Sequence, residues 1–473
     1  MKILGIHFSY DEKRNNELNF MQKVQRLQTK LDMWSARDLT IFGRAMILKT
    51  LGLSQLVYSA SNLVVPQGIA DTVRTKSFKF LWRNKKDKIK RSGLYQEPDR
   101  GGIRVTDLNI MFKALKLAWI PRILASDKRN WCTIPNHFLK KMGGLNFLLR
   151  CNYDATFFND LPIFYKRILD NFNELKTLYN SDYQKQDIVL FNNKEILVGG
   201  KPIFFSKWFK KGIISVKDLL TESGNFLTFQ EFSVKYSCQT NFLQYYQVIS
   251  AIPKHLLSIA KQTDGFNKSF FTSNDNVFPL SETVQINIGK AKSRDFYKLL
   301  NAKTHNEDHT GPLRWSQNLS INSDAWGKIF KSLKNICKDT KLKEFQFKLI
   351  HRIIVTNKEL FRFGIKPDDK CLYCGDNDSI EHTFIECPFT KTFVQRVIQW
   401  FNQTNLCQIL PTTEEVLFGI FSSTCDARIK KKFNYTTLAM RHYIYANKTN
   451  SKTISIHEFI DKLLVKYNLE NIH

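Results

Sequence analysis

No stretch of the sequence is apolar over the roughly 18 residues that a membrane-spanning helix requires. The longest candidate, Leu53–Pro66, is interrupted by Ser, Gln and Asn. A secretory signal is also missing, because residues 1–10 lack a charged region followed by a long apolar one. The nine cysteines are odd in number and mostly scattered, unlike a dense secreted disulfide framework. We therefore expect no membrane partner and a protein of the nucleus and/or the cytoplasm.

The sequence also lacks the common catalytic motifs. It has no Gly-x-x-x-x-Gly-Lys-Ser/Thr loop for nucleotide phosphates, no His-Glu-x-x-His helix and no convincing Ser/His/Asp set. A polymerase needs carboxylates that hold two metal ions about 4 Å apart. The one adjacent pair of aspartates, Asp368–Asp369, follows Pro367 and reads as a polar turn. We expect no catalytic centre in this chain.

Acidic residues are scarce relative to basic ones. The sequence has 43 Asp and Glu against 71 Lys and Arg, which gives a net charge of +28. Such a surplus favours polyanionic partners, since binding releases the counterions condensed on phosphates. The apolar fraction of 43% is sufficient for buried cores, and 473 residues correspond to two to four domains. The composition thus indicates a folded protein that binds RNA and/or DNA.

Apolar residues recur three to four apart in several segments, which predicts helices. The expected helices near the N-terminus cover Leu18–Trp34, Ile41–Leu51, Gly68–Trp82 and Thr106–Leu124, with Thr40 as an N-cap. The same spacing returns later, in Phe226–Leu257, in Phe345, Leu349 and Ile353, and in Phe393, Val397 and Phe401.

Strand patterns are confined to the middle of the chain. Ile188–Phe191 and Glu195–Val198 flank a polar turn and predict a hairpin, after which Gly199–Gly200 turns the chain into Ile203–Phe205. The expected fold is mainly α with a small β component. We divide it into a helical basic domain (1–127), an α+β region (128–290) and a helical C-terminal domain (291–473).

One motif carries recognisable chemistry: Cys371, Cys374, His382 and Cys387 form the pattern C-x2-C-x7-H-x4-C. Zinc prefers four thiolate or imidazole ligands at tetrahedral corners. Four protein ligands leave no open position for water, so we expect one structural zinc ion rather than a hydrolytic one. Gly375 suits the sharp turn after the second cysteine. A redox pair at Cys371 and Cys374 is the alternative, but it needs neither the histidine nor the third cysteine.

The zinc loop itself is acidic. It contains Asp376, Asp378, Glu381 and Glu386 and no Lys or Arg, so it should repel phosphates. Basic residues surround it instead, at Arg362, Lys366, Lys370, Lys391 and Arg396. We interpret the knuckle as a staple that orders the basic segments beside it.

The densest basic stretch is Arg74–Arg104, which Phe80 and Trp82 interleave. It predicts a phosphate track through Lys79, Arg83, Lys85, Lys86, Lys88, Lys90 and Arg91. A second group, Lys348, His351 and Arg352, lies three to four residues apart on one helix face. Lys207, Lys210 and Lys211 form a third group around Trp208. For the last two groups an ordinary solvated surface explains the pattern equally well, and Trp82 alone fits a core residue better than a stacking partner.

Further short motifs follow one another along nearly the whole chain. They are Leu4-Gly5-Ile6; Trp34, Leu39-Thr40, Gly43-Arg44 and Lys49; Phe80-Leu81-Trp82, Pro98, Gly101-Gly102, Asp107, Ala114 and Trp119; Trp208, Gly212-Ile213 and Asp218-Leu219; and Phe345-Gln346-Phe347-Lys348, His351-Arg352, Thr356, Leu360 and Gly364. In this order, with the zinc motif, they resemble the C-terminal half of LINE-type (non-LTR) retrotransposon reverse transcriptases: thumb, connecting region and CCHC zinc-binding domain.

The resemblance implies a thumb that holds primer and template, with Arg44 and Lys49 as further nucleic-acid contacts, and a C-terminal region that engages RNA or DNA. The family's catalytic palm and endonuclease have no counterpart in this sequence. We therefore expect a nucleic-acid-binding portion of such an enzyme, partnered with a separately encoded or upstream polymerase region. The alternatives are a host-adopted zinc-dependent DNA-binding or scaffold protein, a polymerase with unrecognised carboxylates, and a gene fragment.

Overall fold

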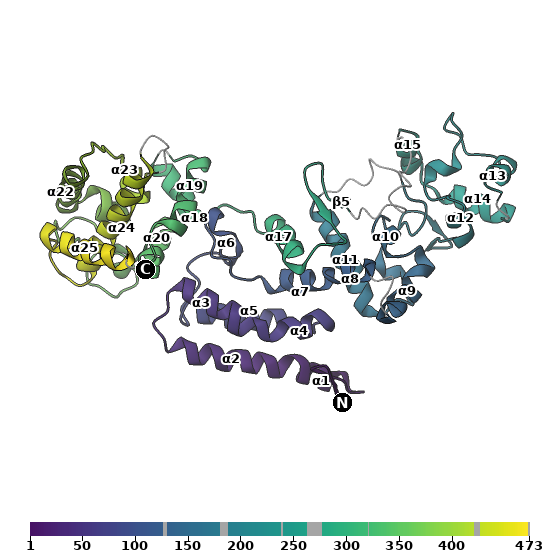
Figure 1. The fold of residues 1–473 in the computed structure, drawn as a ribbon, viewed down its shortest axis with the longest axis horizontal. Coiled ribbons are helices and arrows are strands. Elements are labelled where there is room, and N and C mark those ends of the chain that lie inside the picture. Colours follow the sequence, from purple (N-terminus) through teal and green to yellow (C-terminus); the bar gives the residue numbers. More distant parts are fainter. Residues whose placement is uncertain are drawn as a thin grey trace. The chain divides into compact units, whose positions relative to one another are not determined.

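A computed structural model describes residues 1–125, 130–179, 188–237, 240–262, 277–319, 321–420 and 426–471 (Figure 1). Helices dominate these ranges, and the sheets within them are three antiparallel two-stranded ribbons. The mainly α fold with a small β component is confirmed. In the same ranges, no helix combines the length and apolar character needed to span a bilayer.

The chain forms two compact units, each assembled from three separate segments. Unit 1 comprises Met1–Val24, Ser54–Val73 and Asp107–Thr304, and unit 2 comprises Gln25–Leu53, Arg74–Thr106 and His305–His473. Each unit thus combines residues from the N-terminal quarter with residues far along the chain. The division at residues 127 and 290 stays a prediction.

The elements of unit 1 are β1 (Lys2–Ile3), β2 (Ile6–His7), α1 (Glu12–Asn16), η1 (Glu17–Met21), α4 (Ser54–Asn62), α7 (Leu108–Leu117), α8 (Trp119–Leu124), η4 (Asn130–Cys132), α9 (Thr133–Leu139), η5 (Lys140–Met142), α10 (Leu145–Leu148), η6 (Ala155–Phe157), α11 (Ile163–Leu178), β3 (Leu197–Val198), β4 (Lys201–Pro202), α12 (Ser206–Lys210), η8 (Val216–Leu219), α13 (Phe229–Tyr236), α14 (Phe242–Ala251), α15 (Lys254–Gln262), β5 (Val277–Pro279), β6 (Gln285–Asn287) and α17 (Ser293–Thr304).

The elements of unit 2 are α3 (Ile41–Ile47), η2 (Leu48–Leu53), α6 (Arg91–Tyr95), η3 (Pro98–Arg100), α18 (Thr310–Asn318), α19 (Ser323–Asn335), α20 (Thr340–Ile350), α21 (Asn357–Arg362), η9 (His382–Glu386), α22 (Pro388–Asn405), α23 (Thr413–Phe418), α24 (Ala427–Thr449) and α25 (Ile456–Asn471). Helices α2 (Gln22–Ser35) and α5 (Ile69–Leu81) contribute residues to both units.

The predicted N-terminal helices are present, but the segment Thr106–Leu124 forms two helices, α7 and α8, and one helix end is wrong. Thr40 caps α3, because its hydroxyl accepts a hydrogen bond from Gly43 N at 3.2 Å. The helix does not end at Leu51, however. It continues through the π-helical turn η2 into α4, and Gly52 lies inside it, packed against Leu27 and Leu31.

The predicted hairpin of Ile188–Phe191 with Glu195–Val198 is wrong. Strand β3 pairs instead with β4 across Gly199–Gly200, the turn expected there. Segment 188–191 is buried and bonds to more distant backbone: Leu190 N donates to Ile214 O, and Val216 N donates to Ile188 O, both at 2.8 Å. An apolar run indicates a buried strand but does not specify the segment with which it pairs. The prediction paired it with the nearest candidate in sequence, and that pairing is wrong.

Unit 1 contains a buried cation that fixes the end of α4. The Lys116 ammonium on α7 donates to Ala60 O and Leu63 O at 2.6 Å and to Ser61 O at 3.1 Å. These carbonyls lie at the C-terminal end of α4, where the helix dipole favours a positive charge. Burial lowers the pKa of Lys116 to about 7. Lys116 therefore serves packing within unit 1.

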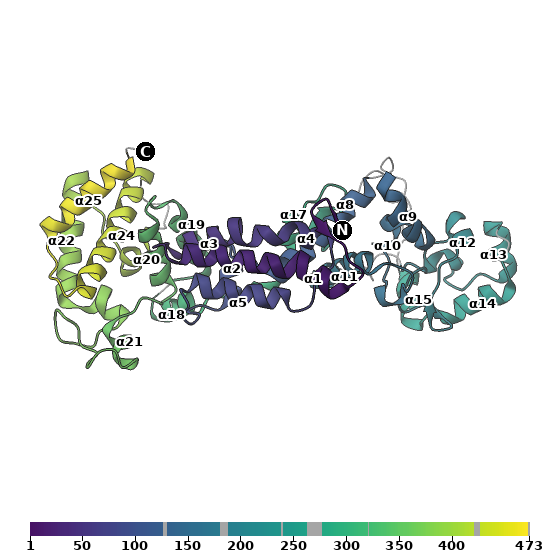
Figure 2. The same cartoon turned by 90° about the horizontal axis from the view of Figure 1, so that it is seen from below.

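The core of unit 2 surrounds α24, whose buried residues include Leu438, Met440 and Ile444. Helices α20 and α22 pack against it, and Figure 2 shows both beside α24. Phe345 and Leu349 are buried as predicted, but α20 ends at Ile350, so Ile353 lies beyond the helix. Arg352 follows with φ +55°, a left-handed conformation that ends the helical path.

Two histidines hold the loop 98–102 against the C-terminal helices of unit 2. His309 Nε2 donates to Arg100 O and His351 Nε2 donates to Gly101 O, each at 2.9 Å. Gly102 permits this fit, since a Cβ there would lie 2.1 Å from the Gln96 carbonyl oxygen. The basic segment 74–106 is thereby part of the same folded unit as the zinc motif.

Candidate metal centre

The four predicted ligands converge on one point in unit 2. The ligand atoms of Cys371, Cys374, His382 and Cys387 all lie within 4.8 Å of one another. Cys387 Sγ is 3.9 Å from Cys371 Sγ and 3.8 Å from Cys374 Sγ, and Cys374 Sγ is 3.1 Å from His382 Nε2. Zinc–sulfur bonds of about 2.3 Å at tetrahedral angles place two sulfurs about 3.8 Å apart. The donor set and its spacing therefore fit zinc.

Local backbone structure explains why these residues meet. Cys371 N donates to Asp376 O at 2.7 Å and Gly375 N donates to Cys371 O at 3.0 Å, which closes the knuckle turn. Gly375 adopts φ +82°, as its predicted role requires. His382 begins the π-helical turn η9, and Cys387 directly precedes α22, whose first residue is proline. Each ligand thus lies at a turn or at a helix end.

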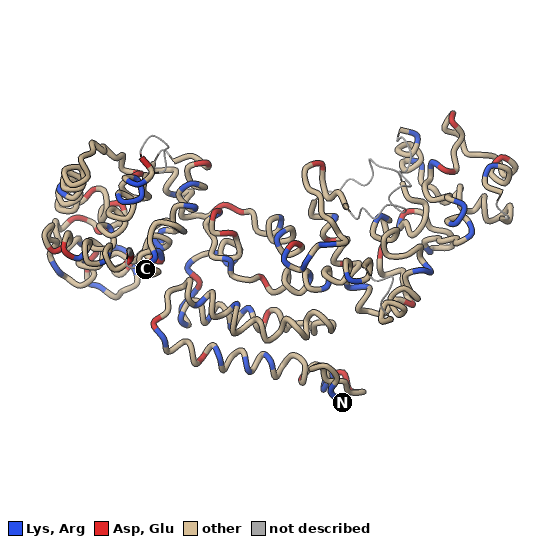
Figure 3. The backbone as a smooth tube through the Cα atoms, in the orientation of Figure 1, with Lys and Arg blue, Asp and Glu red and all other residues tan. Residues whose placement is uncertain are grey.

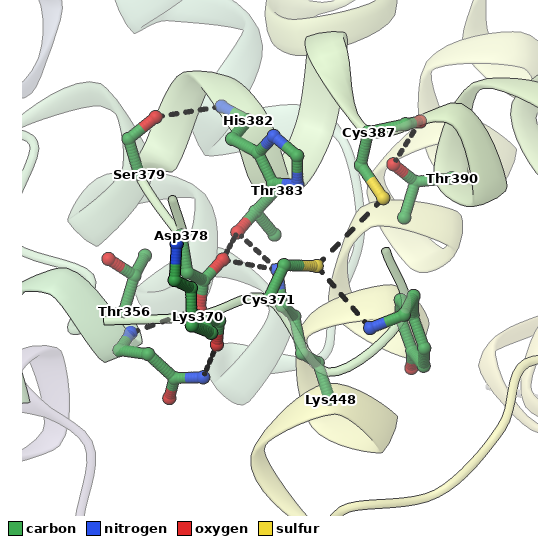
Figure 4. Close-up of polar contacts among 12 residues, drawn as sticks. Thr356, Lys370, Cys371, Asp378, Ser379, His382, Thr383, Cys387, Thr390 and Lys448 are labelled. Carbon is green, nitrogen blue, oxygen red and sulfur yellow. Dashed lines mark hydrogen bonds and ion pairs between the residues drawn. The ribbon is translucent and has the colours of Figure 1, made fainter. Parts of the chain in front are cut away.

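A buried polar cluster supports the thiolates from one side. The Lys448 ammonium on α24 forms an ion pair with Asp378 and donates to Thr383 Oγ1 at 2.9 Å (Figure 4). Burial raises the pKa of the Cys371 thiol, but N–H groups of Tyr373 and Cys374 and the nearby Lys448 charge outweigh burial, so the pKa lies below its ordinary value. This environment favours the thiolate of Cys371, the form that zinc requires, whereas burial raises the pKa of Cys374 to about 12.

Asp378 also connects the knuckle to the next helix. Its Oδ2 accepts a hydrogen bond from Asn357 N, the first residue of α21, at 3.0 Å, and Asn357 Nδ2 donates to Lys370 O at 2.7 Å. One carboxylate therefore joins α24, the knuckle and the start of α21. We expect the orientation of α21 to depend on the metal site.

The four acids of the loop differ in their surroundings. Asp378 pairs with Lys448, and Glu381 pairs with Arg352 at 2.5 Å. Asp376 and Glu386 are exposed. The loop therefore presents less uncompensated negative charge than its sequence indicates. Arg352, expected as a nucleic-acid contact, also lies over the Trp315 ring, with its guanidinium carbon 4.3 Å from the ring centroid.

The twelve predicted nucleic-acid contacts all belong to unit 2, and the structure sorts them into three groups. Lys49, Lys79, Lys85, Lys86 and Lys88 are exposed and have no carboxylate partner among the described residues. Ion pairs engage Arg83 with Asp38, Lys90 with Glu307, Arg91 with Asp87, Lys348 with Glu344 and Arg352 with Glu381. Arg44 and His351 are buried.

The first and second predicted patches lie close together in space. Partial burial and the neighbouring charges of Lys348 and Lys85 lower the pKa of Lys88. His351, by contrast, offers no charge to this surface, because burial and the adjacent His309 lower its pKa to about 3. Trp82 is also buried, which agrees with its interpretation as a core residue. Over the chain as a whole, Lys and Arg are spread through both units (Figure 3).

Sequence reasoning missed Lys448 and the supporting role of Asp378. Lys448 is 66 residues from the site's histidine, and no periodicity marks it. One signal was available for Asp378: it lies inside the knuckle, four residues after Cys374, where a carboxylate needs a partner. Its partner could only be found once the fold was known.

Comparison with known proteins agrees with the geometry. Residues 293–393 match the family described as zinc-binding in reverse transcriptase, a range that includes all four ligands. The uncharacterized 149 kDa protein of transposon TX1 from Xenopus laevis is 22% identical over 248 residues, which make up 49% of this chain and 18% of that protein. An Arabidopsis thaliana protein described as a ribonuclease H protein is 27% identical over 130 residues, 26% of this chain and 21% of that protein.

The matched segments are thus about a fifth of the length of these curated relatives. The C-terminal region carries the zinc-binding domain of reverse transcriptases, and the chain is similar to a transposon protein. Together these findings confirm the resemblance of this chain to the C-terminal portion of a LINE-type reverse transcriptase.

Proposed function

We propose that this chain is the nucleic-acid-binding C-terminal portion of a LINE-type reverse transcriptase, holding template RNA or an RNA–DNA hybrid without polymerising. The observation that carries the proposal is the group of exposed, unpaired lysines in the unit that also holds the zinc ligands: Lys49, Lys79, Lys85, Lys86 and Lys88. Their charge is available to phosphates because no carboxylate among the described residues competes for it.

The proposal assigns one structural zinc ion to Cys371, Cys374, His382 and Cys387. Four protein donors at tetrahedral spacing support a closed site, which orders structure rather than activating water. The catalytic palm is supplied by a polymerase region, upstream or separately encoded, as the partner of this chain. The protein acts in the nucleus and/or the cytoplasm, where its nucleic acids are.

Removing the lysine charges should weaken binding in a salt-dependent manner. We expect wild-type protein to bind a labelled RNA–DNA hybrid without added magnesium, with log K falling linearly as log salt rises. In the variant Lys85→Gln/Lys86→Gln/Lys88→Gln, the magnitude of that slope should fall by about 2 to 3, because each lost phosphate contact removes about 0.9. Fluorescence anisotropy across a salt series measures both slopes.

A matched variant tests whether binding depends on these particular lysines or only on the net positive charge of the protein. Lys207→Gln/Lys210→Gln/Lys211→Gln removes the same charge from exposed positions of unit 1 and should change the slope less. Equal effects of the two triples would contradict a phosphate track at 85–88. Absence of any hybrid or structured-RNA binding at low salt would refute the proposed function itself. Preference for one duplex DNA sequence in competition would favour the host-adopted DNA-binding alternative.

A further inference from the structure

Three large apolar side chains are exposed together at the end of α21. Phe361, Phe363 and Ile365 are 50%, 58% and 67% exposed. Gly364, between the last two, adopts φ +69°, and a Cβ there would have no neighbour within 4 Å. Clustered aromatic exposure costs free energy unless a partner covers it. This group, called the α21 tip, is therefore a candidate contact surface.

The α21 tip is held in place by well-defined contacts. Gly364 N donates to Phe361 O at 2.8 Å and Ile365 N donates to Leu360 O at 2.9 Å, which closes the turn after the helix. The N-terminal end of α21 is fixed to the zinc knuckle through Asp378. Figure 2 shows α21 at the margin of unit 2, apart from α22, α24 and α25. The tip is therefore a preformed surface, and the helix that carries it is anchored to the zinc knuckle.

Cations flank the tip, and the two acids that follow it are engaged: Asp368 Oδ1 accepts from Lys370 N at 3.0 Å and Asp369 Oδ2 accepts from Asn377 Nδ2 at 2.5 Å. Lys358, Arg362 and Lys366 are exposed, and the Lys366 ammonium donates to the neutral amide oxygen of Asn357 at 2.8 Å. The nearest acid on the helix, Glu359, is engaged by the backbone N–H of Thr356 at 3.0 Å. The Arg362 guanidinium carbon lies 5.1 Å from the Phe363 ring centroid. Exposed apolar rings therefore lie beside cations that have no carboxylate partner among the described residues.

We propose that the α21 tip binds single-stranded nucleic acid, with unpaired bases stacked on Phe361 and Phe363 and the adjoining phosphates on Arg362 and Lys366. This inference rests on the proposed function and specifies which form of nucleic acid this part of unit 2 takes. Exposed aromatic rings interleaved with cations match the chemistry of an unpaired strand, which presents a flat base and a phosphate at every nucleotide. A paired duplex hides its base faces and offers only phosphates.

The test compares strands of equal length. Full-length protein is titrated against fluorescein-labelled oligo(U) of about 20 nucleotides and against a duplex of the same length. Phe361→Ala/Phe363→Ala should weaken oligo(U) binding at least about tenfold and leave duplex binding within about twofold, since only stacking is lost. The aromatic variant Phe361→Tyr/Phe363→Trp should restore oligo(U) affinity. Arg362→Gln/Lys366→Gln should weaken oligo(U) binding and reduce its salt dependence.

Several outcomes would overturn the inference. Leu410→Ala removes another exposed apolar side chain of unit 2, 92% exposed, and should leave both affinities unchanged. Wild-type oligo(U) affinity in the double alanine variant would refute the tip's role, while hybrid binding by that variant would leave the proposed function standing. An equal loss for duplex would also refute stacking. If wild-type protein is a dimer and the double alanine variant a monomer by light scattering, the tip is an interface between copies.

Discussion

Replacing Cys374 with serine should release the zinc ion and unfold the region around 360–400, while unit 1 stays folded. A serine hydroxyl is a poor zinc ligand, and three remaining donors leave the site open. Structural zinc contributes about 10–16 kcal/mol of apparent binding free energy in small zinc domains, which is large compared with the usual stability of a domain. The segment just before the knuckle adds little packing, since residues 361–368 are all exposed.

Zinc content per chain, measured by metal analysis, is the first readout. We expect about one ion in wild-type protein and none in Cys374→Ser. Hydrogen exchange is the second, with protection lost around 360–400 and kept in α7 and α17 of unit 1. Cys407→Ser is the matched control, because its thiol lies elsewhere in unit 2 and contacts Asn402 Oδ1 at 3.3 Å. Unchanged zinc content in Cys374→Ser would show that the ligand assignment is wrong.

The Cys374→Ser substitution should weaken the binding of single strands more than the binding of duplexes. The α21 tip depends on the knuckle through Asp378 and Asn357, so oligo(U) binding should fall with the zinc. The exposed Lys85, Lys86 and Lys88 follow α5, in a segment held partly by the contact of His351 with Gly101. Duplex binding should therefore fall less than single-strand binding. An equal fall in both would mean that zinc loss unfolds all of unit 2.

The sequence was sufficient to predict the metal site because its signal is local. Cys371, Cys374, His382 and Cys387 lie within 17 consecutive residues, and zinc dictates both residue type and spacing. Helix periodicity was similarly informative for Phe393, Val397 and Phe401, which α22 buries. In both cases the constraint acts between residues that are close in the sequence. The spacing of residue types is therefore sufficient to predict the structure.

Pairings between distant segments could not be predicted. Ile188–Phe191 bonds to backbone at 214 and 216, where a hairpin with 195–198 was expected. The chain also folds residues 74–106 into one unit with residues 305–473, an association between distant segments that no local pattern records. Charge counting could not show which cations are paired, since Arg83, Lys90 and Arg352 pair with Asp38, Glu307 and Glu381, which lie far from them in the sequence.

Replacing Lys448 with methionine should be the most damaging change outside the zinc ligands. The side chains of Lys448 and Asp378 are 6% and 2% exposed, so their ion pair is shielded from water. Removing one member of a buried pair leaves an uncompensated charge and typically costs about 3–5 kcal/mol. Here the stranded group would be Asp378, which also holds Thr383 and the start of α21. Native-state hydrogen exchange of α24 should report the loss.

Two further variants separate charge from packing. Lys448→Met/Asp378→Asn should recover part of the lost stability, because no buried charge remains and the amide oxygen can still accept from Asn357 N. Lys462→Met breaks the exposed pair with Glu458, whose side chains are 56% and 47% exposed, and should cost only about 0–1 kcal/mol. If the three variants were equally stable, Lys448 would contribute nothing as a charge. If the double variant is more stable than Lys448→Met, the loss in the single variant comes from the unpaired charge of Asp378. The buried pair then stabilises the connection between the metal site and the core of unit 2.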